Sequence, residues 1–103
     1  MKTLPEPLVF IWDEGNIDKN VIKHDVTNKE AEEAITNKPT FLFIDEGHSE
    51  REKRYGLYGR TDNGRRLSIV FTLRSGAVRI VTARDMSRKE RRVYEKIKAN
   101  SGI

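Results

Sequence analysis

Residues 77–94 read AVRIVTARDMSRKERRVY, a β-prone segment that passes directly into a helical pattern. Because side chains alternate across a strand, its first part divides into two faces. The first face holds Val78, Ile80 and Thr82, and the second holds Arg79, Val81 and Ala83. Ser87 and Glu90 then have the spacing of a capping box, which predicts that a helix begins there. The C-terminal part of the chain is therefore expected to be a strand followed by a basic helix.

Two strands joined by tight turns are expected before this segment. YGLYGR at 55–60 is followed by the turn Asp62-Asn63-Gly64, which has hairpin chemistry, and by RLSIVFTL at 66–73. The second of these strands alternates between the apolar Leu67, Ile69, Phe71 and Leu73 and the opposite set Ser68, Val70 and Thr72. This alternation predicts a sheet with one buried face.

The N-terminal half supplies two more strands and a short helix. The apolar runs LVFIW at 8–12 and FLFID at 41–45 have the composition of strands. Thr27 and Glu30 fit another capping box, so a helix with a slim apolar face is expected to follow. With one more helix before it, the predicted order is βααββββα. An antiparallel sheet with helices over one face makes an α+β two-layer sandwich whose other face stays open.

That additional helix is expected from Glu14 to about His24, with Asp13 as its N-cap. Ile17 and Val21 recur at helical spacing and share a stripe with His24. The stripe predicts that His24 is buried or half-buried.

At 103 residues the chain is expected to form one domain, 1–103, because two halves would each bury too little apolar surface. It has no cysteine and no long apolar run, which excludes disulfides, cysteine metal sites and a transmembrane helix. His24 and His48 make a poor zinc signature, so we expect neither a metal nor another cofactor. A cytoplasmic protein is the expected class.

The net charge of +4 hides a division between the two halves of the chain. Residues 1–50 carry five lysines against eleven carboxylates, whereas residues 51–103 carry fifteen basic residues against five acidic ones. Every arginine lies in the second half. Because the planar guanidinium binds phosphate in a bidentate manner, the segregation favours phosphate recognition, with a solvated basic surface as the alternative.

A set of motifs runs in order from about residue 10 to residue 95. They are Trp12-Asp13-Glu14, Asn20, Lys23-His24, Val26, Glu30-Ala31, His48-Ser49-Glu50, Gly59-Arg60, Phe71-Thr72, Arg79-Ile80, Ala83-Arg84, and Glu90-Arg91 with Tyr94. In order and spacing this set resembles the BrnT toxins, although each motif alone is weak. The chain departs from the family pattern at Asp25, where glycine is usual, and at Asn16 and Thr82, where lysine and serine are frequent.

The resemblance implies a toxin of a type II toxin–antitoxin system with a fold similar to that of the RelE ribonucleases. It implies a metal-independent endoribonuclease that cuts RNA through attack of the 2′-OH and thereby inhibits translation. It also implies a BrnA-like ribbon-helix-helix antitoxin, which neutralises the toxin in a hetero-oligomer and binds operator DNA. No membrane partner is implied.

Metal-free RNA cleavage needs cations that stabilise the phosphorane and groups that accept and donate protons. Arg60 and Arg79 are the expected phosphate ligands, because neighbouring strand ends can project both onto the open sheet face. Lys23 and His24 are the other expected catalytic residues, for proton transfer or charge stabilisation. Capping of the helix end is the alternative role for this pair, and His24 could also be a core histidine.

RNA contacts are expected from Arg84, Arg88, Arg92 and Tyr94. Arg84 lies where the strand meets the helix, so pairing with Asp85 or capping is an alternative role. Tyr94 could stack on a base or donate a hydrogen bond, but its helical stripe also fits packing.

Arg60 could instead form a surface salt bridge with Glu50 or Glu52, and His48 with Glu50 could be an acid–base pair on a loop. The chain could be a non-catalytic nucleic-acid-binding module, for which the basic helix at 88–98 would suffice. It could also be a partner-binding module whose arginines face an acidic protein. An antitoxin is expected to cover the arginine-bearing side.

Overall fold

The computed structural model describes residues 4–38, 40–44 and 52–100, which form a four-stranded antiparallel sheet and three helices. In chain order the elements are α1 (Lys19–His24), α2 (Asn28–Thr36), β1 (Phe41–Ile44), β2 (Tyr55–Arg60), β3 (Arg66–Arg74), β4 (Ala77–Asp85) and α3 (Arg88–Asn100). The sheet order is β1-β2-β3-β4, so each strand pairs with its neighbour in sequence. The predicted α+β class is confirmed.

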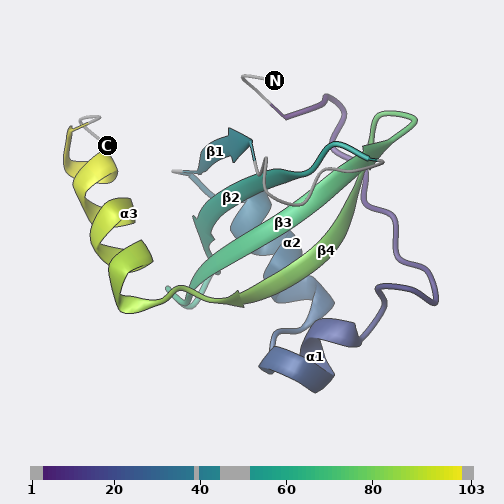
Figure 1. The fold of residues 1–103 in the computed structure, drawn as a ribbon, viewed down its shortest axis with the longest axis horizontal. Coiled ribbons are helices and arrows are strands. Elements are labelled where there is room, and N and C mark those ends of the chain that lie inside the picture. The colour runs from purple at the N-terminus through teal and green to yellow at the C-terminus, as the bar shows by residue number, and fades with distance from the viewer. Residues whose placement is uncertain (1–3, 39, 45–51, 101–103) are drawn as a thin grey trace.

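The helices occupy three different places around the sheet (Figure 1). α2 lies behind the sheet and covers one face, and α1 lies beside β4, which forms one edge of the sheet. α3 lies toward the other edge, which β1 forms, and its Tyr94 contacts Phe41 of that strand. The core fills the space between α2 and the strands, and its largest members are Phe71, Ile35, Leu57, Leu67, Ile69 and Ile80. The face of the sheet turned away from α2 is therefore free of this core.

Local sequence signals place α2 tightly against the sheet. Thr27 Oγ1 accepts a hydrogen bond from the Glu30 N–H at 3.0 Å, and Glu30 Oε1 accepts one from the Thr27 N–H at 3.0 Å, so the predicted capping box is present. The buried Ala34 lets the helix approach β2 closely. At the contact β2 has Gly59, where any side chain would overlap the Ala34 carbonyl.

The first predicted strand, at 8–12, is reduced to a single bridge. Phe10 pairs in parallel with Val78 on the outer side of β4, and hydrogen bonds of 2.7 and 2.8 Å join Val9 O and the Ile11 N–H to that residue. Pro5 and Pro7 have no N–H groups to extend the pairing before this point. After Ile11 the edge of β4 is bonded by side chains instead.

Those side chains belong to α1 and to the turn before it. The prediction that the stripe with Ile17 and Val21 is the buried side of this helix is therefore wrong. The helix begins at Lys19 rather than at residue 14, and it buries Asn20 while Ile17, Val21 and Ile22 are exposed. The reason lies in the edge of β4, whose backbone groups would otherwise lack partners.

Three polar side chains supply these partners. Asn16 Nδ2 donates to Ile80 O at 3.0 Å and to Ile11 O at 2.9 Å, and Asn16 is 1% exposed. Asn20 Oδ1 accepts from the Ala83 N–H at 3.0 Å. Lys19 Nζ donates to Val81 O at 3.1 Å. The helix therefore binds the sheet through its polar side, which leaves its apolar side toward solvent.

A β-bulge in β4 changes which side chains share a face. Val70 of β3 pairs with Thr82, but the next residue of β3, Phe71, pairs with Ile80. Val81 is thus an extra residue without a cross-strand partner. Before the bulge, the predicted alternation of β3 and β4 is confirmed.

After the bulge the predicted alternation of β4 is wrong, because one extra residue inverts it. Ala83, which was expected beside Arg79, is fully buried in the core with Val78. Thr82 and Arg84 consequently lie on the same face as Arg79, even though Arg79 and Arg84 are an odd number of residues apart. The bulge brings two expected site residues together.

Candidate functional site

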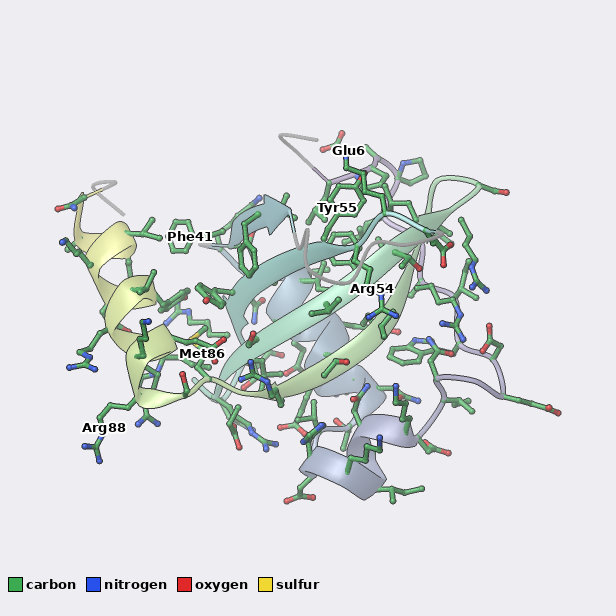
Figure 2. The ribbon with its side chains drawn as sticks, in the orientation of Figure 1. Glu6, Phe41, Arg54, Tyr55, Met86 and Arg88 are labelled. Atoms are coloured by element: carbon green, nitrogen blue, oxygen red, sulfur yellow. The ribbon has the colours of Figure 1, made fainter. Side chains whose placement is uncertain are left out.

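The sheet face turned away from α2 carries Arg79 and Arg84, and we call it the arginine face. From β1 to β4 its side chains are Phe41, Phe43, Tyr58, Arg60, Arg66, Ser68, Val70, Thr72, Arg74, Ala77, Arg79, Thr82 and Arg84. Figure 2 shows Arg54 extended in front of the strands on this same side. The face thus combines cationic, aromatic and small polar groups.

Arg79 is held by a bidentate ion pair with Asp13. Its Nε donates to Asp13 Oδ2 at 3.1 Å and its Nη2 to Oδ1 at 3.0 Å, and the arginine side chain is 15% exposed. The hydrogen bond from Arg79 lowers the pKa of Asp13, so the pair is ionised at neutral pH. Among the described residues, none accepts a hydrogen bond from Nη1 of Arg79.

Gly15 fixes the position of this pair from the N-terminal side. Its N–H donates to Asp13 Oδ1 at 2.9 Å, and a side chain at residue 15 would collide with the Arg79 guanidinium. Asp13 was expected to cap the first helix. Its carboxylate instead joins the N-terminal segment to β4, while its carbonyl accepts the Ile17 N–H at 2.7 Å.

Arg84 is held in the same manner by Glu90 from the first turn of α3. Its Nη1 donates to Glu90 Oε1 at 2.7 Å and its Nη2 to Oε2 at 3.0 Å. The Ser87 N–H also donates to Oε1, at 2.8 Å, so Glu90 serves both the arginine and the predicted capping box. The hydrogen bond from Arg84, opposed by burial, lowers the pKa of Glu90 to about 2. Asp85, the expected alternative partner, offers only its carbonyl, at 3.1 Å.

Tyr58 and Ser68 complete this cluster, and neither was expected from the sequence to be a site residue. Ser68 pairs with Arg84 in the sheet register, and its hydroxyl donates to Glu90 Oε2 at 3.4 Å. Tyr58 pairs with Ser68, and burial together with the nearby Glu90 raises the pKa of Tyr58. The register shows that Tyr58 shares a face with Arg84, because Tyr58 pairs with Ser68 and Ser68 pairs with Arg84.

Arg60 lies at the end of β2, where it is exposed and where α3 approaches the sheet. Its pairing partner in β3, Arg66, forms an ion pair with Glu95 at 3.0 Å. Tyr94 is 1% exposed, its ring meets that of Phe41 edge-on at a centroid distance of 5.4 Å, and burial raises its pKa. A contact between Tyr94 and RNA would therefore require α3 to move away from β1.

Lys23 and His24 end α1, and Arg65 ties this helix end to the sheet. Lys23 is exposed and His24 is half-buried, as predicted. Arg65 Nη2 donates to His24 O at 3.2 Å and Nη1 to Asp25 O at 2.6 Å, while Nε donates to Asp85 Oδ1 at 2.6 Å. Asp25 has a φ of 55°, so it adopts the left-handed helix end at which the family usually has glycine.

The four expected catalytic residues do not form one cluster. The contacts of Arg65 place Lys23 and His24 near Asp85 at the end of β4. Arg79 lies six residues earlier in that strand, roughly 20 Å away at about 3.3 Å per residue. Arg60 lies apart from both of these places, at the end of β2 beside α3. The structure does bring Arg79 and Arg84 together on one face.

Arg88 and Arg92, the remaining expected RNA contacts, lie on the exposed side of α3. Figure 2 shows Arg88 extending away from the sheet. Within residues 52–100, no ion pair involves either side chain. They could therefore bind a phosphate without first breaking a salt bridge.

Two kinds of feature are absent from the described residues, clusters of metal-ligating side chains and membrane-spanning helices. No three histidine or acidic side chains of the described ranges come close enough to hold a metal ion. None of the described helices is both long and apolar enough to span a membrane. His48 and Glu50, the alternative acid–base pair, lie outside the described residues, and Glu50 was also one of the two alternative partners of Arg60.

A protein-family model matches residues 12–90, well over half of the chain. The model is described as the ribonuclease toxin, BrnT, of type II toxin-antitoxin systems. No curated protein matches the chain. The matched range begins at Trp12 and ends at Glu90, so it includes both carboxylates that hold the arginine pair.

Proposed function

Because the chain belongs to the BrnT family of ribonuclease toxins of type II toxin–antitoxin systems, we propose that the arginine face binds and cleaves RNA. The observation that carries the proposal is the bulge at Val81, which places Arg79 and Arg84 on one face where carboxylates hold each guanidinium in a fixed orientation. Fixed donors stabilise developing charge without reorganising during the reaction. A ribonuclease must bind the phosphates of RNA, and this face presents ordered cations that can bind them.

In the proposed reaction the 2′-oxygen of one nucleotide attacks the adjacent phosphorus, and the 5′-oxygen of the next nucleotide leaves. Arg84, which precedes Asp85 and is therefore the nearer of the two arginines to Lys23 and His24, donates from Nε to the charge that builds up on the phosphorane. Arg79 donates from its Nη1 to another phosphate of the same strand, because its partner Thr72 lies four residues, or roughly 13 Å, from the Arg84 partner Ser68 along β3. Arg60 and the exposed Arg88 and Arg92 hold phosphates farther along the strand. No metal takes part.

Lys23 and His24 serve the proton transfers in this proposal. RNA that crosses the β4 edge passes from the arginine face to the end of α1, where Lys23 is exposed and His24 half-buried. The histidine can take the 2′-OH proton as a general base. Lys23 can donate a proton to the leaving 5′-oxygen.

The partner in this proposal is a ribbon-helix-helix antitoxin that covers the arginine face and carries the toxin to operator DNA. Acidic side chains of such a partner would meet the cations that otherwise bind phosphate. The toxin acts in the cytoplasm, where cleavage of RNA inhibits translation.

Induced expression with and without the neighbouring antitoxin gene tests this function. RNA ends mapped after induction should show new cleavage sites, growth should stop, and the antitoxin should suppress both effects. The Arg79→Ala variant should remove the new ends while its folded yield stays the same. Salt-sensitive RNA binding without new ends would instead identify a non-catalytic binding module.

A further inference from the structure

Phe43 places a large aromatic ring on the arginine face and leaves it half open to solvent. The residue lies in β1, the outermost strand, and is 42% exposed. Its Cα partner across the strand pair is Gly56, and the ring lies over this glycine so closely that a side chain there would overlap it. The ring therefore lies against the backbone of β2 rather than extending into solvent.

A second aromatic side chain supports the ring from the side. The Tyr58 ring lies 5.0 Å from that of Phe43, centroid to centroid, with the planes inclined at 59°. Tyr58 itself is held by the cluster around Glu90 and Arg84. The position of Phe43 is thus fixed by the same network that fixes one of the two arginines.

The neighbouring Phe41 shows what a purely structural aromatic residue looks like in this strand. It points to the same face two residues earlier, and its ring is covered by Tyr94 of α3. Phe43 is more exposed than Phe41, although a buried position would be favourable for a ring of this size. The exposed surface of Phe43 is consequently available to a ligand.

The sheet register places Phe43 between the two arginines along the strand direction. Phe43, Gly56, Val70 and Thr82 form one row across the four strands. The adjacent row on one side contains Arg84, and the row beyond the bulge on the other side contains Arg79. Between Phe43 and β4 the row has only an aliphatic and a hydroxyl side chain, and it spans about 14 Å for three strand spacings.

We propose that Phe43 is a base-stacking subsite, which holds one nucleobase of the RNA while Arg79 and Arg84 hold its phosphates. This inference rests on the proposed function and adds a residue that selects how the RNA lies on the sheet. An exposed aromatic ring about 14 Å across the sheet from ordered cations fits a short RNA strand, in which one base stacks on the ring while phosphates of neighbouring nucleotides reach the arginines. A purine covers more of the ring than a pyrimidine does, so the subsite favours adenine or guanine.

A double-mutant cycle tests the subsite. It combines Phe43→Leu in the protein with single abasic positions in a short RNA. Leucine keeps apolar contact with Gly56 but removes the aromatic face. The RNA carries 2′-O-methyl groups so that binding is measured without cleavage. With the wild-type protein, one abasic position should weaken binding about 5- to 100-fold, as expected for loss of one stacked base. With Phe43→Leu, the intact RNA should bind weakly, and that same abasic position should cause no further loss.

Phe43→Tyr should restore affinity, because a tyrosine ring stacks as phenylalanine does. The inference is overturned if wild type and Phe43→Leu bind the intact RNA equally, or if every abasic position weakens the two proteins by the same factor. Failure of the proposed function gives a different result, in which wild type neither cuts unmodified RNA nor binds the modified one. Fluorescence of 2-aminopurine at the sensitive position should be quenched by the wild type and much less by Phe43→Leu, whereas equal quenching would also overturn the inference.

Discussion

Along the outer edge of β4, Asn16, Lys19 and Asn20 bind backbone atoms of the strand, whereas on the arginine face Arg79 and Arg84 bind carboxylates from outside the sheet. At the edge, the two asparagines are almost completely buried, and their hydrogen bonds complete the sheet. On the arginine face, each guanidinium is oriented by its carboxylate but keeps a nitrogen for another group. Both regions are polar and lie on the same strand, yet the first stabilises the fold and the second presents charge.

The difference shows that an ion pair can fix the orientation of a guanidinium for ligand binding as well as neutralise its charge. Arg74 and Glu52 form a superficially similar pair at 3.1 Å, but Arg74 is an exposed residue at the end of β3. Arg79 is far less exposed and is enclosed by Gly15. Placement within the fold, rather than residue type, therefore separates the candidate ligand from the surface salt bridge.

The largest effect on both regions is expected from deletion of Val81, the extra residue of the bulge. Without it, one end of β4 must shift by a residue, which either removes Ala83 from the core or turns Arg79 away from Arg84. We expect a loss of at least about 3 kcal/mol in the free energy of unfolding, or failure to fold, measured by urea titration. Val81→Ala keeps the bulge and serves as the control. A deletion variant with unchanged stability and cleavage would contradict the assigned register.

Asn16→Ala should weaken the contacts at the β4 edge and leave the arginine face unchanged. This change leaves two buried carbonyls, of Ile11 and Ile80, without their donor, which should cost about 2–4 kcal/mol of unfolding free energy. The remaining folded protein should bind RNA as before. Ile22→Ala on the neighbouring helix removes a side chain that is 84% exposed and should change stability by less than about 0.5 kcal/mol. Equal stability of the two variants would show that the edge contacts do not stabilise the sheet.

Glu90→Gln should reveal a pH-dependent contribution on the arginine face. The folded-state pKa of Glu90 is lowered to about 2 from an ordinary 4.5, so its stabilising effect is complete above the ordinary value and is lost as pH falls toward 2. At neutral pH the variant should be less stable by about 1–2 kcal/mol. Thermal unfolding of both proteins across this acidic range should show the difference shrinking as pH falls. A constant difference would argue against the ion pair as its source.

Asp13→Asn should have the smallest effect, and it should act on cleavage rather than on folding. The amide can accept one hydrogen bond from Arg79 but cannot supply the charged bidentate partner, so the guanidinium becomes less well ordered. We expect a decrease in the cleavage rate of about tenfold, measured at saturating RNA. Glu95→Gln, which alters the Arg66 pair at the other end of β3, should leave the rate unchanged. Equal rates for all three proteins would mean that orientation of Arg79 by Asp13 is unimportant.

Local sequence signals predicted those parts of the fold that depend on neighbours in the chain. Both capping boxes, the antiparallel meander and the buried face of β3 need only propensity and alternation, and each is confirmed. The α+β class follows from these elements.

The bulge and the side of α1 that faces the sheet depend on contacts that local patterns do not encode. Nothing in AVRIVTAR marks Val81 as the extra residue, because both registers keep β-branched residues in the strand. Likewise, Ile17 and Val21 look like the buried stripe until the unpaired edge of β4 makes Asn16 and Asn20 the better inward residues. The positions of Arg84, Tyr58 and Phe43 relative to one another follow from this register, so they required the structure.

Cleavage of RNA by four purified proteins, all in EDTA, tests the central claim most directly. The set comprises wild type, Arg79→Ala, Arg84→Ala, and Arg91→Ala as the matched variant of an exposed arginine on α3 that has no part in the proposed reaction. We predict that wild type and Arg91→Ala cut at the same rate, and that Arg79→Ala and Arg84→Ala are each slower by about 10²-fold while each loses no more than about 1–2 kcal/mol of unfolding free energy through the broken ion pair. Full activity of both Arg79→Ala and Arg84→Ala, or cleavage by wild type only when a metal is added, would contradict the account.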